Sequence, residues 1–64
     1  MAFYRTILRA SEREILINLE HVENVYDDHG CATFVMISRE REQPRAFETR
    51  APFSEAASTV LRST

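Results

Sequence analysis

The chain has no lysine and no tryptophan, and it holds one glycine, one cysteine and two prolines among 64 residues. A single cysteine excludes a disulfide within the chain and fits a reducing compartment. The N-terminus lacks the basic region and long apolar core of a secretory signal, and no apolar run approaches the roughly 20 residues of a membrane span. We therefore expect a cytoplasmic protein without a membrane segment.

The short length limits how much apolar surface the chain can bury. Sixty-four residues make a single small domain, residues 1–64, and a chain of this size buries only about 60% of its unfolded surface. Small domains usually gain further stability from disulfides, a metal or a partner subunit. The first is excluded and two histidines make the second doubtful, so we expect a homo-oligomer.

The charge balance argues against a nucleic-acid surface. Eight arginines against ten acidic residues give a net charge of −2, whereas non-specific binding to nucleic acid depends on a positive surface. Because every strong cation is arginine, each can make bidentate contacts with a carboxylate or a phosphate.

Alternating apolar residues separated by charged turns indicate strands over most of the chain. We expect strands at residues 3–10, 15–19, 31–38 and 45–50, and a weaker one beginning near Val22. Asn18 should break the second strand, since asparagine bonds readily to nearby backbone. The spacing of Val22 and Val25 indicates a short helical turn leading into the third strand. The clearest turn is residues 27–30, which contains the only glycine, Gly30.

The period changes to a helical one after Ala51. A proline at the first turn of a helix costs no hydrogen bond, which suits Pro52. One apolar stripe follows at helical spacing, made of Phe53, Ala56, Ala57, Val60 and Leu61. The predicted fold is therefore α+β: a small antiparallel β-meander of about five strands closed by one C-terminal amphipathic helix. We expect Phe53 to be a main contributor to its core.

The residues that suggest catalysis or metal binding have simpler interpretations. Asp28, His29 and Cys31 lie within one short turn, where neighbouring side chains diverge and do not form the aligned nucleophile and base that catalysis needs. The ligand spacings of structural zinc sites are absent. There is no glycine-rich phosphate loop and little room for a closed cleft. We expect neither an enzyme nor a cofactor or metal.

Two surfaces are candidates for binding. One helix can cover only one face of a sheet, so the other face should stay apolar and favour self-association; its residues are Phe3, Ile7, Leu16, Val35 and Ile37. The alternative is a sheet that curls into a half-barrel and covers itself. The second candidate is the charged loop after the fourth strand, where Arg39, Arg41 and Arg45 could contact a partner or nucleic acid, although interleaved glutamates argue against a phosphate.

The segment from Ile15 to Val25 resembles the small bacterial FlbD-like (swarming-motility) proteins. The shared pattern is an apolar strand ending in Asn18, an apolar pair three apart, a polar turn, a strand containing Thr33 and a C-terminal amphipathic helix. The chain departs from it in having residues 11–14 where a glycine turn is usual, in its longer charged loop and in its lack of lysine. The strand-strand-helix ending is also similar to the second half of LytTR DNA-binding domains, which are longer and more basic.

Both resemblances imply regulation rather than catalysis. The sequence therefore predicts a small non-enzymatic regulatory or adaptor protein that binds a protein partner and self-associates. The alternatives are a nucleic-acid-binding regulator that uses the arginine loop, and a protein that binds a small ligand at a subunit interface.

Overall fold

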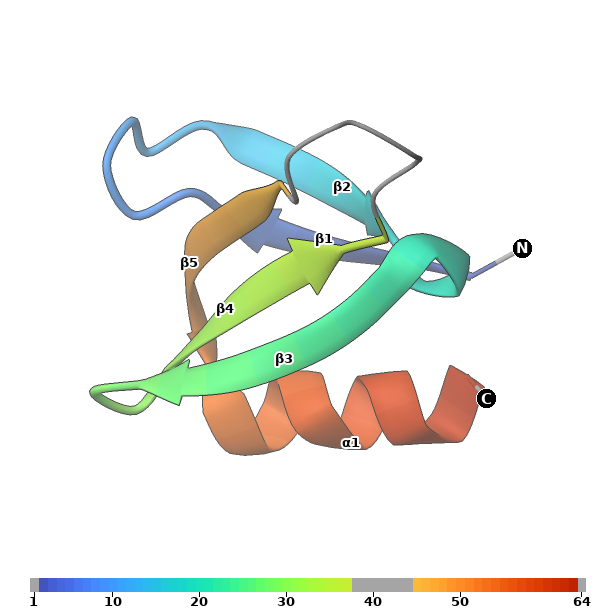
Figure 1. The fold of residues 1–64 in the computed structure, drawn as a ribbon. Coiled ribbons are helices and arrows are strands. Elements are labelled where there is room, and N and C mark those ends of the chain that lie inside the picture. Colours follow the sequence, from blue (N-terminus) through green and yellow to red (C-terminus); the bar gives the residue numbers. More distant parts are fainter. Residues whose placement is uncertain (1, 38–44, 64) are drawn as a thin grey trace.

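The computed structural model describes residues 2–37 and 45–63 and has the predicted α+β architecture (Figure 1). The order of elements along the chain is β1 (Phe3–Ile7), β2 (Glu14–Asn18), the 3-10 helix η1 (Leu19–His21), β3 (Val22–Asp28), β4 (Cys31–Met36), β5 (Ala46–Pro52) and α1 (Phe53–Ser63). All strand pairs are antiparallel. The fold class inferred from the sequence is thus confirmed.

The five strands divide into two sheets, a division that the periodicity did not reveal. β1 and β2 form a hairpin, and β3, β4 and β5 form a three-stranded meander in that order. An isolated bridge between Leu8 and Thr49 joins them, next to a hydrogen bond from the Arg9 N–H to the Glu48 carbonyl of 2.9 Å. The hairpin therefore lies beside β5, and among the described residues this isolated bridge is the strand pairing that joins it to the larger sheet.

The predicted boundary of the first strand needs correction. β1 ends at Ile7 rather than at residue 10, because a tight turn closes there. The Leu8 N–H donates to the Arg13 carbonyl, and the Glu12 N–H donates to the Leu8 carbonyl. Glu12 adopts a left-handed φ of 58°, which an extended strand does not allow.

The short helical turn also lies earlier than predicted. It occupies Leu19–His21, whereas Val22 and Val25 both belong to β3. Asn18 does end β2 as expected, because its side-chain oxygen accepts from the Glu20 N–H at 3.0 Å and caps the 3-10 turn. The three residues of η1 therefore connect the last strand of the hairpin to the first strand of the three-stranded sheet.

The loop between β3 and β4 is tighter than the predicted four-residue turn. β3 continues to Asp28, and only His29 and Gly30 lie between the strands. Their φ values are 53° and 88°, and a two-residue hairpin loop of type I′ needs positive φ at both positions. The Asp27 carboxylate accepts from the Gly30 N–H at 2.8 Å and holds the turn.

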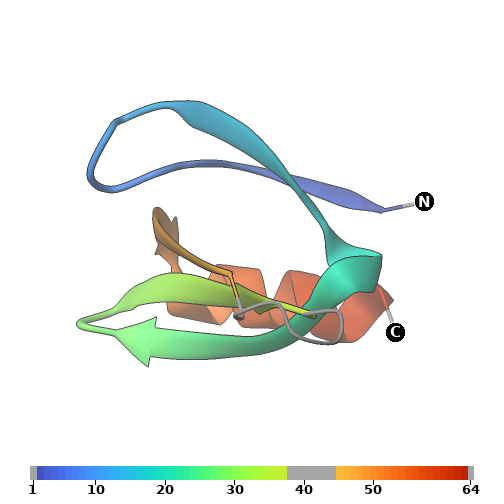
Figure 2. The same ribbon diagram turned by 45° about the horizontal axis from the view of Figure 1, so that its top comes forward.

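The core lies on one face of the three-stranded sheet. Phe34 of β4 is fully buried there with Ile17 from the hairpin and Ala56 from α1. The Tyr4 ring lies 5.7 Å from the Phe34 ring, centroid to centroid. Figure 2 shows the hairpin arching over the sheet. The hairpin and α1 thus share the covering of this face, which is close to the curled alternative considered from the sequence.

The C-terminal helix is confirmed, but its predicted stripe is only partly buried. Ala56 is fully buried and Val60 packs against the core, whereas Leu61 is 73% exposed and Phe53 is only half-buried. The hairpin occupies part of the sheet face that the helix was expected to cover, so the stripe is wider than the surface left for it. Within the described residues, no helix is long and apolar enough to cross a membrane.

Phe34, rather than Phe53, is therefore the side chain whose truncation should unfold the domain. Phe34→Ala should cost about 3–5 kcal/mol, comparable to the whole stability of a domain this small. Ser58→Ala, on the exposed side of α1, should change stability by no more than about 0.5 kcal/mol. Circular dichroism melts of the two variants check this, and a Phe34→Ala protein that melts with the parent would contradict the described core.

Candidate functional site

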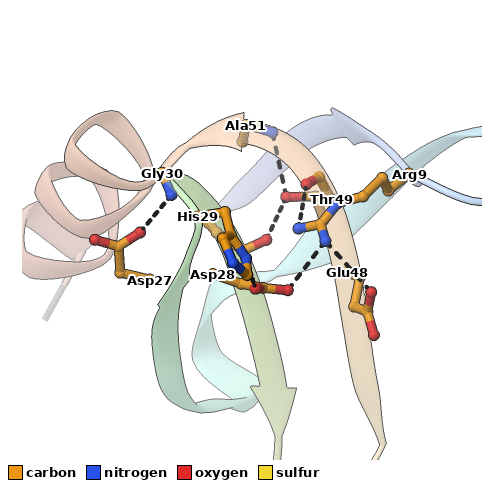
Figure 3. Close-up of polar contacts among 9 residues, drawn as sticks. Arg9, Asp27, Asp28, His29, Gly30, Glu48, Thr49 and Ala51 are labelled. Carbon is orange, nitrogen blue, oxygen red and sulfur yellow. Dashed lines mark hydrogen bonds and ion pairs between the residues drawn. The ribbon is translucent and has the colours of Figure 1, made fainter.

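A cluster of polar side chains surrounds Arg9 at the end of the three-stranded sheet (Figure 3). The Arg9 guanidinium donates to the Asp28 carboxylate at 3.0 Å, to the Glu48 carboxylate at 3.5 Å and to the Thr49 carbonyl at 3.4 Å. Asp28 ends β3 and Glu48 lies in β5. One side chain from the β1–β2 turn thus reaches both outer strands of the other sheet.

The ion pair between Arg9 and Asp28 shifts the pKa values of both side chains. Hydrogen bonding to Arg9, and then to His29, holds the pKa of Asp28 below its usual 3.8. The same hydrogen bond to Asp28 raises the pKa of Arg9 above its usual value. Asp28 is therefore charged throughout the neutral range, and both of its oxygens have partners, because His29 Nδ1 lies 2.7 Å from Oδ1.

Side chains with shifted pKa values often mark active sites, but structural ion-pair networks shift pKa values too. The cluster around Arg9 has the features of such an ion-pair network. The His29 side chain is almost fully exposed, so nothing shields it from water. Cys31 is half-buried in β4, opposite Asp28 in the register. Among residues 2–37 and 45–63, no three His, Cys, Asp or Glu side chains converge as a metal site requires.

The fully buried Thr49 continues the cluster into the sheet. Its hydroxyl donates to the Ala32 carbonyl at 2.7 Å and accepts from the Ala51 N–H at 3.3 Å, where the β4–β5 register shifts. Because Arg9 binds the carbonyl of the same residue, the cluster joins the hairpin turn to the irregular part of β5. We interpret it as a structural clasp.

No sequence pattern pointed to Arg9. Its side-chain partners lie 19 and 39 positions away, and nothing local distinguishes Arg9 from the other seven arginines. Knowledge that the turn after β1 lies against β5 would have been needed to find it.

Three of the predicted self-association residues do lie together. Phe3, Ile7 and Leu16 are between 41% and 63% exposed. The register pairs Arg5 with Leu16, so Leu16 lies diagonally between Phe3 and Ile7 on the outward side of the hairpin. Their alternate neighbours point inward, as the burial of Thr6 and Ile17 shows. We call Phe3, Ile7 and Leu16 the hairpin face.

The other two residues belong to a different surface. Val35 is half-buried, and Ile37, just past the end of β4, is 56% exposed. Tyr26 joins them, since it is 54% exposed and its partner Thr33 is two residues from Val35 on the same side of β4. We call Tyr26, Val35 and Ile37 the sheet face. The prediction therefore combined two separate surfaces and missed Tyr26, whose outward position depends on the register with β4.

The predicted arginine loop lies mostly outside the described residues. Arg39 and Arg41 fall in residues 38–44, and Arg45 is exposed just before β5, where its carbonyl accepts from the Met36 N–H at 2.8 Å. On the hairpin face, Arg5 is paired with Glu14 at 3.3 Å. Arg5 is therefore compensated rather than presented to a phosphate.

The hollows on the surface are shallow, with volumes of about 270 to 330 Å³. Sites for small molecules usually enclose most of their ligand in about 300–1,000 Å³. The hollow between β1 and the start of α1 contains the Tyr4 ring, and burial followed by the Glu55 carboxylate raises the pKa of its hydroxyl. A neutral phenol beside paired charges provides no strong anchor for a ligand.

The clasp should weaken in acid. Because the pKa of Asp28 is lower in the folded protein, its contribution is complete above pH 3.8 and is lost as the pH falls through its folded pKa. A double-mutant cycle with Arg9→Gln and Asp28→Asn should show favourable coupling at pH 7 and weaker coupling at a pH well below 3.8, where Asp28 begins to be protonated in the folded protein. Chemical denaturation at both pH values measures this, and equal coupling at the two would show that Asp28 does not titrate as described.

Comparisons of the chain with protein-family models, curated proteins and solved structures give no match. The resemblance to FlbD-like proteins therefore stays a prediction.

Proposed function

We propose that this chain is a small, non-enzymatic regulatory or adaptor protein of the cytoplasm that self-associates and acts by binding a protein partner. The hairpin face is the observation that supports this most strongly. Three large apolar side chains lie on it, each about half exposed, with Leu16 diagonally between Phe3 and Ile7. Adjacent apolar groups of this kind usually mark an interface, whereas single exposed ones are ordinary.

The energetic argument depends on the size of the chain. Burying a large apolar side chain contributes about 1.5–3 kcal/mol relative to leaving it fully exposed. Covering three half-exposed ones would add several kcal/mol, comparable to the stability that one core of this size supplies. No disulfide within the chain can provide this, because Cys31 is the only cysteine. A second subunit would supply it.

The sheet face is the proposed surface for the protein partner. It lies on the opposite side of β4 from Phe34 and presents Tyr26 and Ile37 to solvent. Tyrosine is enriched at interfaces because it combines a large apolar ring with a polar hydroxyl. Since the two faces belong to different sheets, one chain could bind a second copy and another protein at the same time.

Self-association is tested first by the mass of the protein in solution. Sedimentation velocity at micromolar concentration should show a dimer or larger species. Phe3→Ser combined with Ile7→Ser removes exposed apolar area without touching the core, so each subunit should stay folded, while an assembly in which the hairpin faces pack together should be weakened. A folded monomer for the wild type under these conditions would overturn this part of the proposal.

The partner surface is tested by comparing variants in capture experiments. Tagged protein should retain a specific protein from native extract, and Tyr26→Ser with Ile37→Ser should lose that protein while its own oligomeric state is unchanged. Ser58→Ala is the matched control and should capture normally. If nuclease treatment of the extract abolishes capture of the partner, the result would instead support the alternative that this protein is a nucleic-acid-binding regulator.

A further inference from the structure

The two outer strands of the fold differ in how well they resist pairing with another chain. Within residues 2–37 and 45–63, β2 pairs only with β1, and β3 pairs only with β4. Unpaired strand edges invite association unless charges, bulges, prolines or a covering element block them. β3 has such protection: a register irregularity between Val22 and Asn24, the exposed acids Glu23 and Asp27, and contact with α1.

Among the described residues, β2 has fewer of these devices, since its one charged residue is Glu14, at its first position. Its pairing with β1 is regular over all five residues, and its centre is Ile15, Leu16 and Ile17. Figure 1 and Figure 2 place it at the rim of the hairpin, on the side of the molecule away from α1. An apolar strand with a regular free edge is the part of this fold best suited to pair with another strand.

The hydrogen bonds at the two ends of the hairpin show which backbone groups face outward. The Leu19 N–H donates to the Ala2 carbonyl at 3.0 Å, and the Leu8 N–H donates to the Arg13 carbonyl at 2.9 Å. Hydrogen-bonded pairs alternate along an antiparallel ladder, so Ile15 and Ile17 bond to β1. Glu14, Leu16 and Asn18 must then direct their N–H and C=O groups away from β1.

From this we infer that the self-association proposed above occurs through β2, which pairs antiparallel with β2 of a second copy about a two-fold axis at Leu16. In this register the N–H and C=O of Leu16 meet those of Leu16 in the second copy. Glu14 and Asn18 form the flanking hydrogen-bonded pairs. The two hairpins become one four-stranded sheet in which the outward N–H and C=O of Leu16 bond across the axis. The Asn18 carbonyl, at the N-cap of η1, already accepts within the 3-10 turn.

The side chains fit this register. Glu14 lies opposite Asn18 of the second copy, where the amide can donate to the carboxylate, while the Asn18 oxygen keeps its bond to the Glu20 N–H. Ile15 lies opposite Ile17 on the inner face. An axis at Glu14 would instead place two carboxylates against each other, and any other axis would leave part of each five-residue strand unpaired.

The test removes one backbone donor without disturbing the hairpin. Leu16→Pro deletes only an outward N–H, and proline is tolerated at an edge position, so circular dichroism should remain native. Sedimentation should show at least a ten-fold weaker dimer than the wild type. Leu16→Val, which keeps the donor, is the control and should dimerise normally.

The outcomes separate this inference from the general proposal. If Leu16→Pro is folded and dimerises like the wild type, pairing through β2 is wrong although self-association stands. If the wild type is itself monomeric, both fail. If Phe3→Ser with Ile7→Ser abolishes the dimer while Leu16→Pro does not, the hairpin faces pack against each other and the inference is overturned.

A cross-linking experiment covers the case in which the proline variant does not fold. In a Cys31→Ala background, Leu16→Cys should form an intersubunit disulfide under mild oxidation, because hydrogen-bonded partners lie about 5.5 Å apart between Cα atoms. Glu14→Cys should not, since its symmetry mate is four residues further along, or about 14 Å. Equal cross-linking at both positions would contradict the register.

Discussion

The burial of Phe34 is the contact on which the rest of this structure depends. Its ring is enclosed on one side of the sheet by Tyr4 and Ile17 from the hairpin and by Ala56 from the helix. Neither cover is large enough alone, since the helix has 11 residues and each hairpin strand has five. Among the described residues, both covers lie on one face, and side chains on the opposite face of the sheet and on the back of the hairpin are exposed to solvent.

The hairpin is held to the sheet by a small number of polar contacts as well as by the core. The Leu8–Thr49 bridge and the Arg9 guanidinium lie at one end, and the 3-10 turn lies at the other. The polar contacts fix the position of the hairpin turn, while Phe34 and its neighbours supply the apolar burial. The charged cluster around Arg9 therefore serves the junction of the two sheets, beside a shallow hollow that Glu48 helps to line.

Much of the fold could be read from local patterns. Asn18 ends a strand by capping with its own side chain, Gly30 lies in a turn that requires positive φ, and Val35 and Ile37 lie on the side of β4 away from the core, as the alternation predicted. What could not be read was the relation between distant segments. The split into two sheets and the role of Arg9 depend on contacts across as many as 41 positions. The exposure of Leu61 depends on the hairpin competing with the helix for the sheet.

The alternation of backbone directions in β2 has a consequence for amide hydrogen exchange. In a single copy, the amides of Ile15 and Ile17 are bonded to β1 and should exchange slowly, while those of Glu14, Leu16 and Asn18 point to solvent and should exchange fast. Pairing of two β2 strands would protect all five amides alike. The exchange rates of the β2 amides in the wild-type protein therefore show, residue by residue, whether a second strand is paired with its outer edge.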